Sequence, residues 1–165
     1  MTAQGHVEAR RLWQKALQEM QADVLLVLDE SGYLIDTVGS RPGLSAEILS
    51  SLAAASLMAL REIRHQAHIG QSDDHELVIL EGPLGRVIMG KGGQGLVFVA
   101  VLPPDSFLGM ARLIFKQLLE RQWDVALPSA DDLSVPPFPG ADELSDDFEE
   151  LEGFDLDAIW SNGSS

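Results

Sequence analysis

The run Leu96–Leu102, written LVFVAVL, restricts the possible folds more than any other stretch of the chain. It is apolar throughout and rich in valine, and Pro103 and Pro104 follow it at once, which is typical of a buried β-strand that ends at the prolines. Because successive side chains of a strand point to opposite faces, apolar residues at every position require cover on both faces. We therefore expect a sheet with this strand near its centre and helices on both sides.

The periodicity of apolar residues supplies the other elements. Three segments have helical spacing, and four more short β-rich runs are separated by turns. Strands joined by short turns pair antiparallel. The expected fold class is α/β (α+β): a five-stranded antiparallel sheet between helices, in the order α-β-β-α-β-β-β-α. The expected helices are 6–21, 45–68 and one after Pro104, and the expected strands are 24–28, 33–38, 77–80, 86–89 and 96–102.

Local signals fix some of the boundaries. Gly32 can adopt the positive φ of a tight turn, which predicts a hairpin from the first two strands. Ser45 or an adjacent residue can cap the middle helix. The last helix is expected to bury one face, made of Phe107, Met110, Ala111, Ile114, Leu118 and Leu119.

Charge divides the chain into two parts. The formal net charge is −15, and residues 131–165 contain eleven acids and no Lys or Arg. Pro128 and the prolines at 136, 137 and 139 prevent regular structure at the joint. We therefore expect one domain at 1–127 and an acidic, proline-containing, disordered tail at 128–165.

Composition also limits the partners and the location. Phosphates and anionic lipids would be repelled, so we expect no nucleic acid and no docking on anionic membranes. The chain has no cysteine, which excludes disulfides and thiolate zinc sites. Residues 1–20 contain charges throughout and no apolar signal-peptide core, so we expect a cytoplasmic location.

The middle helix contains an uncharged run of thirteen residues, ILSSLAAASLMAL at 48–60. It is shorter than the ~20 apolar residues that span a membrane, so we expect no membrane insertion. On a helical wheel, one half should face the sheet: Leu44, Ile48, Leu49, Leu52, Ala53, Ala55, Ala59, Leu60 and Ile63. The other half is predicted as a dimer or partner face: Glu47, Ser50, Ser51, Ala54, Leu57, Met58 and Arg61. The alternative is that Leu57 and Met58 are ordinary surface residues.

No convincing set of residues for chemistry, cofactors or metals is visible. Residues 85–91 match GxxxxGK, but Gly92 stands where a P-loop has Ser or Thr, and the segment has the pattern of a strand. Residues 90–95 match GxGxxG, but a strand follows them instead of a helix. Among His65, His68, His75, Asp73 and Asp74 no closed ligand set can be recognised.

The tail ends in a segment that interleaves acids with large apolar residues. Such segments can fold when they bind a partner, which predicts a recognition motif at 148–160. One alternative is a merely solubilising tail, and another is a tail that covers the chain's own docking face. The candidate recognition residues are Phe148, Leu151, Phe154, Leu156, Ile159 and Trp160.

Three stretches in this order resemble the roadblock/dynein light chain family: VLLVLDESGYLI at 24–35, LAAA at 52–55 and FLGMAR at 107–112. The resemblance implies a five-stranded sheet that dimerises through sheet edges and paired middle helices. Bacterial members of the mutual gliding-motility protein B type act on small Ras-like GTPases. We therefore expect a non-catalytic, cytoplasmic, homodimeric GTPase regulator, although a heterodimer with a related chain is also possible.

Two further function classes stay open beside this one. The first is a purely structural adaptor or scaffold subunit without effect on nucleotide hydrolysis. The second is an enzyme in its own right, which the failed motif tests disfavour. If the protein is a GTPase regulator, Arg61 and Arg64 are the arginines to watch, although their place at a solvated helix end is the favoured explanation for both.

Overall fold

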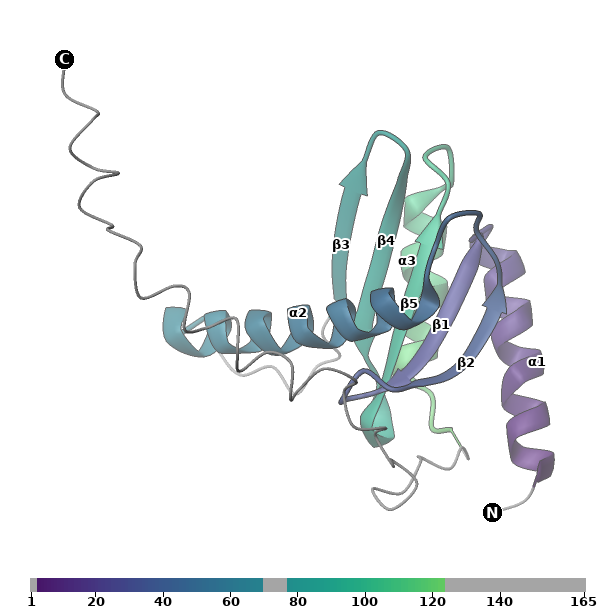
Figure 1. The fold of residues 1–165 in the computed structure, drawn as a ribbon, viewed down its shortest axis with the longest axis horizontal. Helices are drawn as coiled ribbons and strands as arrows, with labels where there is room; N and C mark the ends of the chain where they lie inside the picture. Colours follow the sequence, from purple (N-terminus) through teal and green to yellow (C-terminus); the bar gives the residue numbers. More distant parts are fainter. Residues whose placement is uncertain (1–2, 70–76, 124–165) are drawn as a thin grey trace, which may run out of the picture. The chain divides into compact units, whose positions relative to one another are not determined.

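The computed structural model describes residues 3–69 and 77–123. The chain separates into two units, Met1–Leu127 and Pro128–Ser165, and all described residues lie in the first. That unit contains a five-stranded antiparallel sheet with the strand order β2-β1-β5-β4-β3 (Figure 1). The strands are β1 (Val24–Asp29), β2 (Leu34–Gly39), β3 (Leu77–Gly82), β4 (Gly85–Lys91) and β5 (Leu96–Leu102). The helices are α1 (Ala3–Met20), α2 (Ala46–Ala67) and α3 (Leu108–Glu120), with a short 3-10 turn η1 at Gly93–Gly95.

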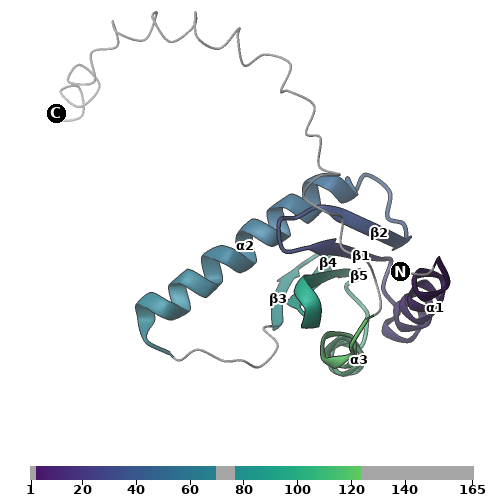
Figure 2. The same ribbon diagram turned by 90° about the horizontal axis from the view of Figure 1, so that it is seen from below.

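Strand β5 lies at the centre of the sheet, as its composition predicted. It pairs with β1 on one side and β4 on the other, and every one of its residues is buried. Helices α1 and α3 cover one face of the sheet, and α2 crosses the other (Figure 2). The predicted order of elements, the antiparallel pairing and the cover on both faces are confirmed.

The side chains on the two faces of β5 belong to two separate hydrophobic cores. Phe98, Ala100 and Leu102 pack with the α1 and α3 side chains, including Trp13 and Phe115. Val97, Val99 and Val101 pack instead with Ala53, Ala54 and Leu57 of α2. This alternation is the period-2 pattern of a strand buried on both sides.

The first hairpin turns where Gly32 was expected to allow it. Gly32 has φ +91°, and the Asp29 carboxylate accepts hydrogen bonds from the backbone N–H groups of Ser31 and Tyr33. A Cβ on Gly32 would lie 3.2 Å from both the Ala54 Cβ and the Ser51 Cα. The turn therefore presses directly against α2, which limits the size of the helix residues beneath it.

Helix α2 has clear signals at both ends. Ser45 accepts a hydrogen bond from the backbone N–H of Ile48, as a capping residue does. At the other end His68 adopts the left-handed conformation, and its N–H bonds back to the last turn. Both boundaries agree with the prediction.

The buried face of α3 differs from the prediction at its start. Phe107 is 72% exposed and Met110 is 47% exposed, so neither belongs to the buried face. Phe107 is exposed because α3 begins at Leu108, which leaves Phe107 before the first turn with its side chain in solvent. The buried residues are Ala111, Ile114, Phe115, Leu118 and Leu119.

Candidate protein–protein interface

The structure reverses part of the predicted orientation of α2. Ser50, Ala54 and Leu57 were predicted on a dimer or partner face, but they are buried against the sheet. Together with Ala53 they form the inner stripe of the helix. The prediction for Ser50, Ala54 and Leu57 is therefore wrong.

The reversal has a simple steric cause. The first hairpin approaches α2 so closely at Gly32 that only small residues fit between them, and Ala54 fills that place. Ser50 is fully buried without an unpaired hydroxyl, because its Oγ donates to the Ala46 carbonyl oxygen at 2.7 Å. The helix thus approaches the sheet through its small residues, and several larger ones are left outside.

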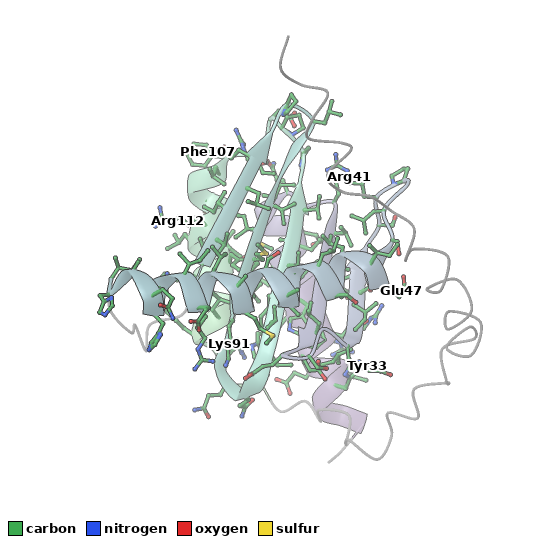
Figure 3. All side chains as sticks on the ribbon, turned by 60° about the vertical axis from the view of Figure 1, so that its left-hand side comes forward. Tyr33, Arg41, Glu47, Lys91, Phe107 and Arg112 are labelled. Atoms are coloured by element: carbon green, nitrogen blue, oxygen red, sulfur yellow. The ribbon has the colours of Figure 1, made fainter. Side chains whose placement is uncertain are left out.

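The other predicted interface residues, Glu47, Ser51, Met58 and Arg61, are exposed. Figure 3 looks onto the face of the sheet that α2 crosses, with Glu47 near the N-terminal end of the helix. Five residues predicted to face the sheet point outward instead. These are Ile48, Leu52, Ala55, Ala59 and Ile63.

An apolar stripe therefore runs along the outer surface of α2. Its large members are Ile48, Leu52, Met58 and Ile63, and each is about three-fifths or more exposed. Ala55 and Ala59 lie between them. Spacings of three and four residues place these side chains on one side of the helix, which we call the outer stripe of α2. A continuous apolar surface of this kind marks a protein-interaction site more often than a scattered exposed residue does.

The C-terminal half of α2 extends past β3, away from the sheet (Figures 1 and 2). Leu57 is the last buried residue of the helix, and those from Met58 to Ala67 are exposed or half-buried. Ile69, just beyond the helix, is 70% exposed. An isolated helical segment of this length gains little stability from its backbone alone, so this overhang is a second indication of a missing neighbour.

The edge strand β3 lies beside this overhang (Figure 1). Among the described strands it pairs only with β4, and its Leu80 side chain is 54% exposed. The opposite edge strand, β2, has more protection from α1. Arg10 pairs with the Asp36 carboxylate and also donates to the main-chain oxygen of Thr37. Unprotected edges are where another chain can pair, so among the described strands β3 has the edge better suited to assembly.

Within residues 3–69 and 77–123 no cluster of His, Cys, Asp or Glu could hold a metal ion. His65 and His68 lie exposed at the end of α2, whereas His75, Asp73 and Asp74 fall outside the described residues. The GxxxxGK lookalike is strand β4, as its pattern predicted. The GxGxxG lookalike is the connection from β4 through η1 to β5.

The two arginines of interest differ in their surroundings. Arg61 is exposed on α2, while Arg64 is half-buried and already interacts with a neighbour. The candidate recognition residues of the tail, from Phe148 to Trp160, lie outside the described part of the chain. Among the described helices, none is long and apolar enough to cross a membrane.

Neither the known protein-family models nor the curated proteins give a match to this sequence. Solved structures do resemble the fold. MglB of Myxococcus xanthus is 20% identical, covers 87% of this chain and 97% of its own, and has a TM-score of 0.60. A structure described as MglB with a tetrameric arrangement is 18% identical over 73% of this chain and 88% of its own, with a TM-score of 0.64.

A roadblock/LC7 domain from Streptomyces avermitilis gives a similar result. It is 15% identical, covers 66% of this chain and 89% of its own, and has a TM-score of 0.58. At identities of 15–20%, these structural likenesses show the fold alone. The chain therefore has the roadblock/LC7 fold, in an arrangement similar to that of MglB.

Proposed function

We propose that this protein is a dimeric, non-catalytic regulator of a small Ras-like GTPase. The observation that carries the proposal is the outer stripe of α2 beside the open edge of β3, on a fold similar to that of MglB. The stripe and the edge support assembly. The GTPase as partner rests on the resemblance to the bacterial members of the roadblock family, to which we assign this chain.

A second copy of the same chain would complete the surfaces that the single chain leaves open. In a two-fold dimer the same patch meets itself, so an apolar stripe and an unpaired strand edge are both self-complementary. Two α2 helices could pack through Leu52 and Ala55 while two β3 edges pair. A related chain with the same features could take the second place, and MglB itself is known in a tetrameric arrangement.

The proposed effect on the GTPase does not involve a catalytic side chain from this protein. A regulator can raise the population of the hydrolysis-competent conformation of the GTPase if it binds that conformation more tightly than the other conformations. The GTPase then supplies its own catalytic groups. We propose that Arg61 and Arg64 contribute at most to binding, and that this protein is not an enzyme.

The test is a pull-down of candidate Ras-like GTPases from the same organism, each loaded with GDP or with a non-hydrolysable GTP analogue. The proposal predicts binding that depends on the bound nucleotide, followed by a changed rate of hydrolysis or exchange. Binding that ignores the nucleotide and leaves both rates unchanged would favour the alternative, a structural dimeric adaptor. The outer stripe of α2 would serve that role equally well.

We also propose that Phe148, Leu151, Phe154, Leu156, Ile159 and Trp160 form a recognition motif for a partner. The alternation of these residues with acids supports this proposal. A basic groove is the chemistry that fits them, and the association should weaken as salt is added.

A further inference from the structure

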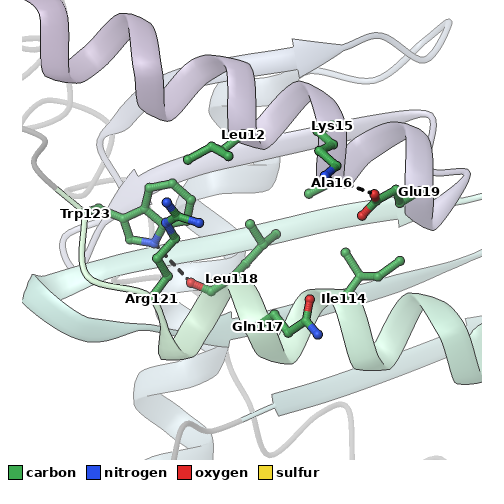
Figure 4. A pocket seen from close by; sticks show the side chains of 9 residues that line it. All are labelled: Leu12, Lys15, Ala16, Glu19, Ile114, Gln117, Leu118, Arg121 and Trp123. Carbon is green, nitrogen blue, oxygen red and sulfur yellow. Dashed lines mark hydrogen bonds and ion pairs between the residues drawn. The ribbon is translucent and has the colours of Figure 1, made fainter.

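The face of the sheet opposite α2 carries a different surface, between α1 and α3. The two helices leave a hollow of about 140 Å³ between them (Figure 4). Leu12 and Ala16 of α1 and Ile114 and Leu118 of α3 contribute apolar walls. Lys15 and Arg121 also line the hollow, one from each side of it, and Glu19 lines it beside Lys15 (Figure 4).

The size of the hollow selects what it can hold. Sites for cofactors and drug-sized ligands usually enclose ~300–1,000 Å³, so this hollow is too small for them. A cavity of ~150 Å³ can accept a group as large as benzene. One aromatic or leucine-sized side chain is therefore a suitable occupant.

The apolar surface continues beyond the hollow along α3. Met110 precedes Ile114 by one turn and is 47% exposed, and Leu113 on the next position around the helix is 55% exposed. Because Met110 lies one turn before Leu113 and Ile114 on the same helix, a ligand longer than one side chain could contact Met110 as well as the hollow. We call the hollow together with this adjoining apolar surface of α3 the groove.

The charged side chains that line the hollow are Lys15, Arg121 and Glu19, so the bases outnumber the acids there, although the formal charge of the chain is −15. The Arg121 guanidinium lies 5.4 Å from the centroid of the Trp123 ring, a cation–π contact that leaves its N–H groups able to bind an anion. Lys15 approaches Glu19 at 3.7 Å, but both are exposed, so that pair is weak.

We infer that this groove binds an acidic, amphipathic peptide segment of a partner protein. One apolar side chain of the peptide occupies the hollow, and flanking carboxylates pair with Lys15 and Arg121. Complementary charge and an apolar anchor are together the usual basis of helix-in-groove recognition. The inference goes beyond the proposed function, because α1 and α3, which form the groove, lie on the opposite face of the sheet from α2 (Figure 2).

The test uses the full chain and a synthetic probe. The probe is a fluorescein-labelled amphipathic 15-residue peptide of Glu and Ala with one Phe and two Leu on one side. We expect saturable binding by fluorescence polarisation, with the Trp123 indole N–H as a perturbed NMR signal. A second peptide in which Phe and Leu are replaced by Ser reports the contribution of charge alone, and it should bind at least tenfold more weakly.

Three exposed positions provide the variants. Lys15→Glu and Arg121→Glu should each weaken binding of the probe by about tenfold or more, because an attraction becomes a repulsion. Lys116→Glu is the matched control, since it makes the same charge change on α3 outside the hollow, and it should weaken binding less than about threefold. Thermal unfolding of each variant verifies that the fold is intact.

Two results would overturn the inference. One is the absence of saturable binding at millimolar probe, or equal binding of the Ser-substituted peptide. The other is an equal loss in Lys116→Glu and Arg121→Glu, which would indicate attraction by net charge without a defined site. A Leu52→Glu variant on α2 should bind the probe as the wild type does, so the outcome is independent of the GTPase proposal.

Discussion

The contact between Gly32 and Ala54 shows how one small residue fixes the orientation of a helix. Ala54 is 4% exposed and lies directly beneath the first hairpin. The sequence places apolar side chains on both halves of α2, so apolar bulk alone did not identify the inner half. The short distance between α2 and the first hairpin determines which half of the helix is buried. A helical wheel carries no information about that distance.

Replacing Ala54 with Leu should destabilise the fold by ~1–3 kcal/mol, because the added carbons have no space beneath the hairpin. The adjacent Ala55 is exposed, so Ala55→Leu is the matched control and should cost less than ~0.5 kcal/mol. Urea unfolding of both variants measures the difference. Equal losses of stability would mean that Ala54 is not the buried member of the pair.

The carboxylate of Asp36 provides a second residue-scale test. Its side chain is 7% exposed, and it pairs with Arg10 and approaches His6 Nε2 at 3.2 Å. Arg10→Ala should lower the free energy of unfolding by ~1–3 kcal/mol, because a nearly buried acceptor loses its charged donor. Arg11→Ala removes the neighbouring exposed arginine and should have little effect. If urea unfolding gives the same midpoint for both variants, the Arg10–Asp36 pair does not hold α1 on the sheet.

At the scale of elements, most of the fold could be predicted because its signals are local. The β5 run, the turn at Gly32 and the cap at Ser45 each follow from a few adjacent residues, and all three agree with the structure. Which face of α2 is buried depends on residues far away in the sequence, so it could not be predicted. The prediction that Phe107 is buried was wrong for a related reason, because the exposure of its side chain depends on the residue at which α3 begins.

The overhanging half of α2 gives an element-scale prediction. If a second copy packs on it, backbone amides from Met58 to Ala67 should exchange slowly with solvent at concentrations where the protein is dimeric. In the Leu52→Glu variant the same amides should exchange at least tenfold faster, because a helical segment without packing opens readily. Native-state hydrogen exchange measures this directly. Fast exchange in the wild-type protein would show that nothing packs on the overhang.

At the scale of the whole molecule, the fold presents two different surfaces on opposite faces of one sheet. The outer stripe of α2 is apolar and lies beside β3, which pairs only with β4 among the described strands, and this combination suits a copy of the same chain. The groove between α1 and α3 is lined by two bases, Lys15 and Arg121, and one acid, Glu19, which suits an acidic peptide with an apolar anchor. A protein built in this way can dimerise through one face and recruit a partner through the other.

The proposed mechanism makes a prediction about Arg61. Arg61→Ala should weaken binding of the GTPase by a few-fold and lower stimulated hydrolysis only to the same extent, since an exposed charge contributes little. Single-turnover hydrolysis at saturating regulator separates binding from chemistry. A loss of ~10³-fold or more at saturation would instead identify an arginine finger and contradict a non-catalytic role. Arg64→Ala is assayed in parallel with the same expectation.

The most direct test of the account is sedimentation velocity of the full chain at micromolar concentration, comparing wild type with Leu52→Glu. We predict that the wild type sediments as a dimer and that Leu52→Glu sediments as a folded monomer, because a carboxylate would be buried without a partner in the interface. Leu113→Glu makes the same substitution at a similarly exposed leucine of α3 and should remain dimeric. A monomeric wild type, or a Leu52→Glu variant that stays dimeric, would contradict the proposed interface.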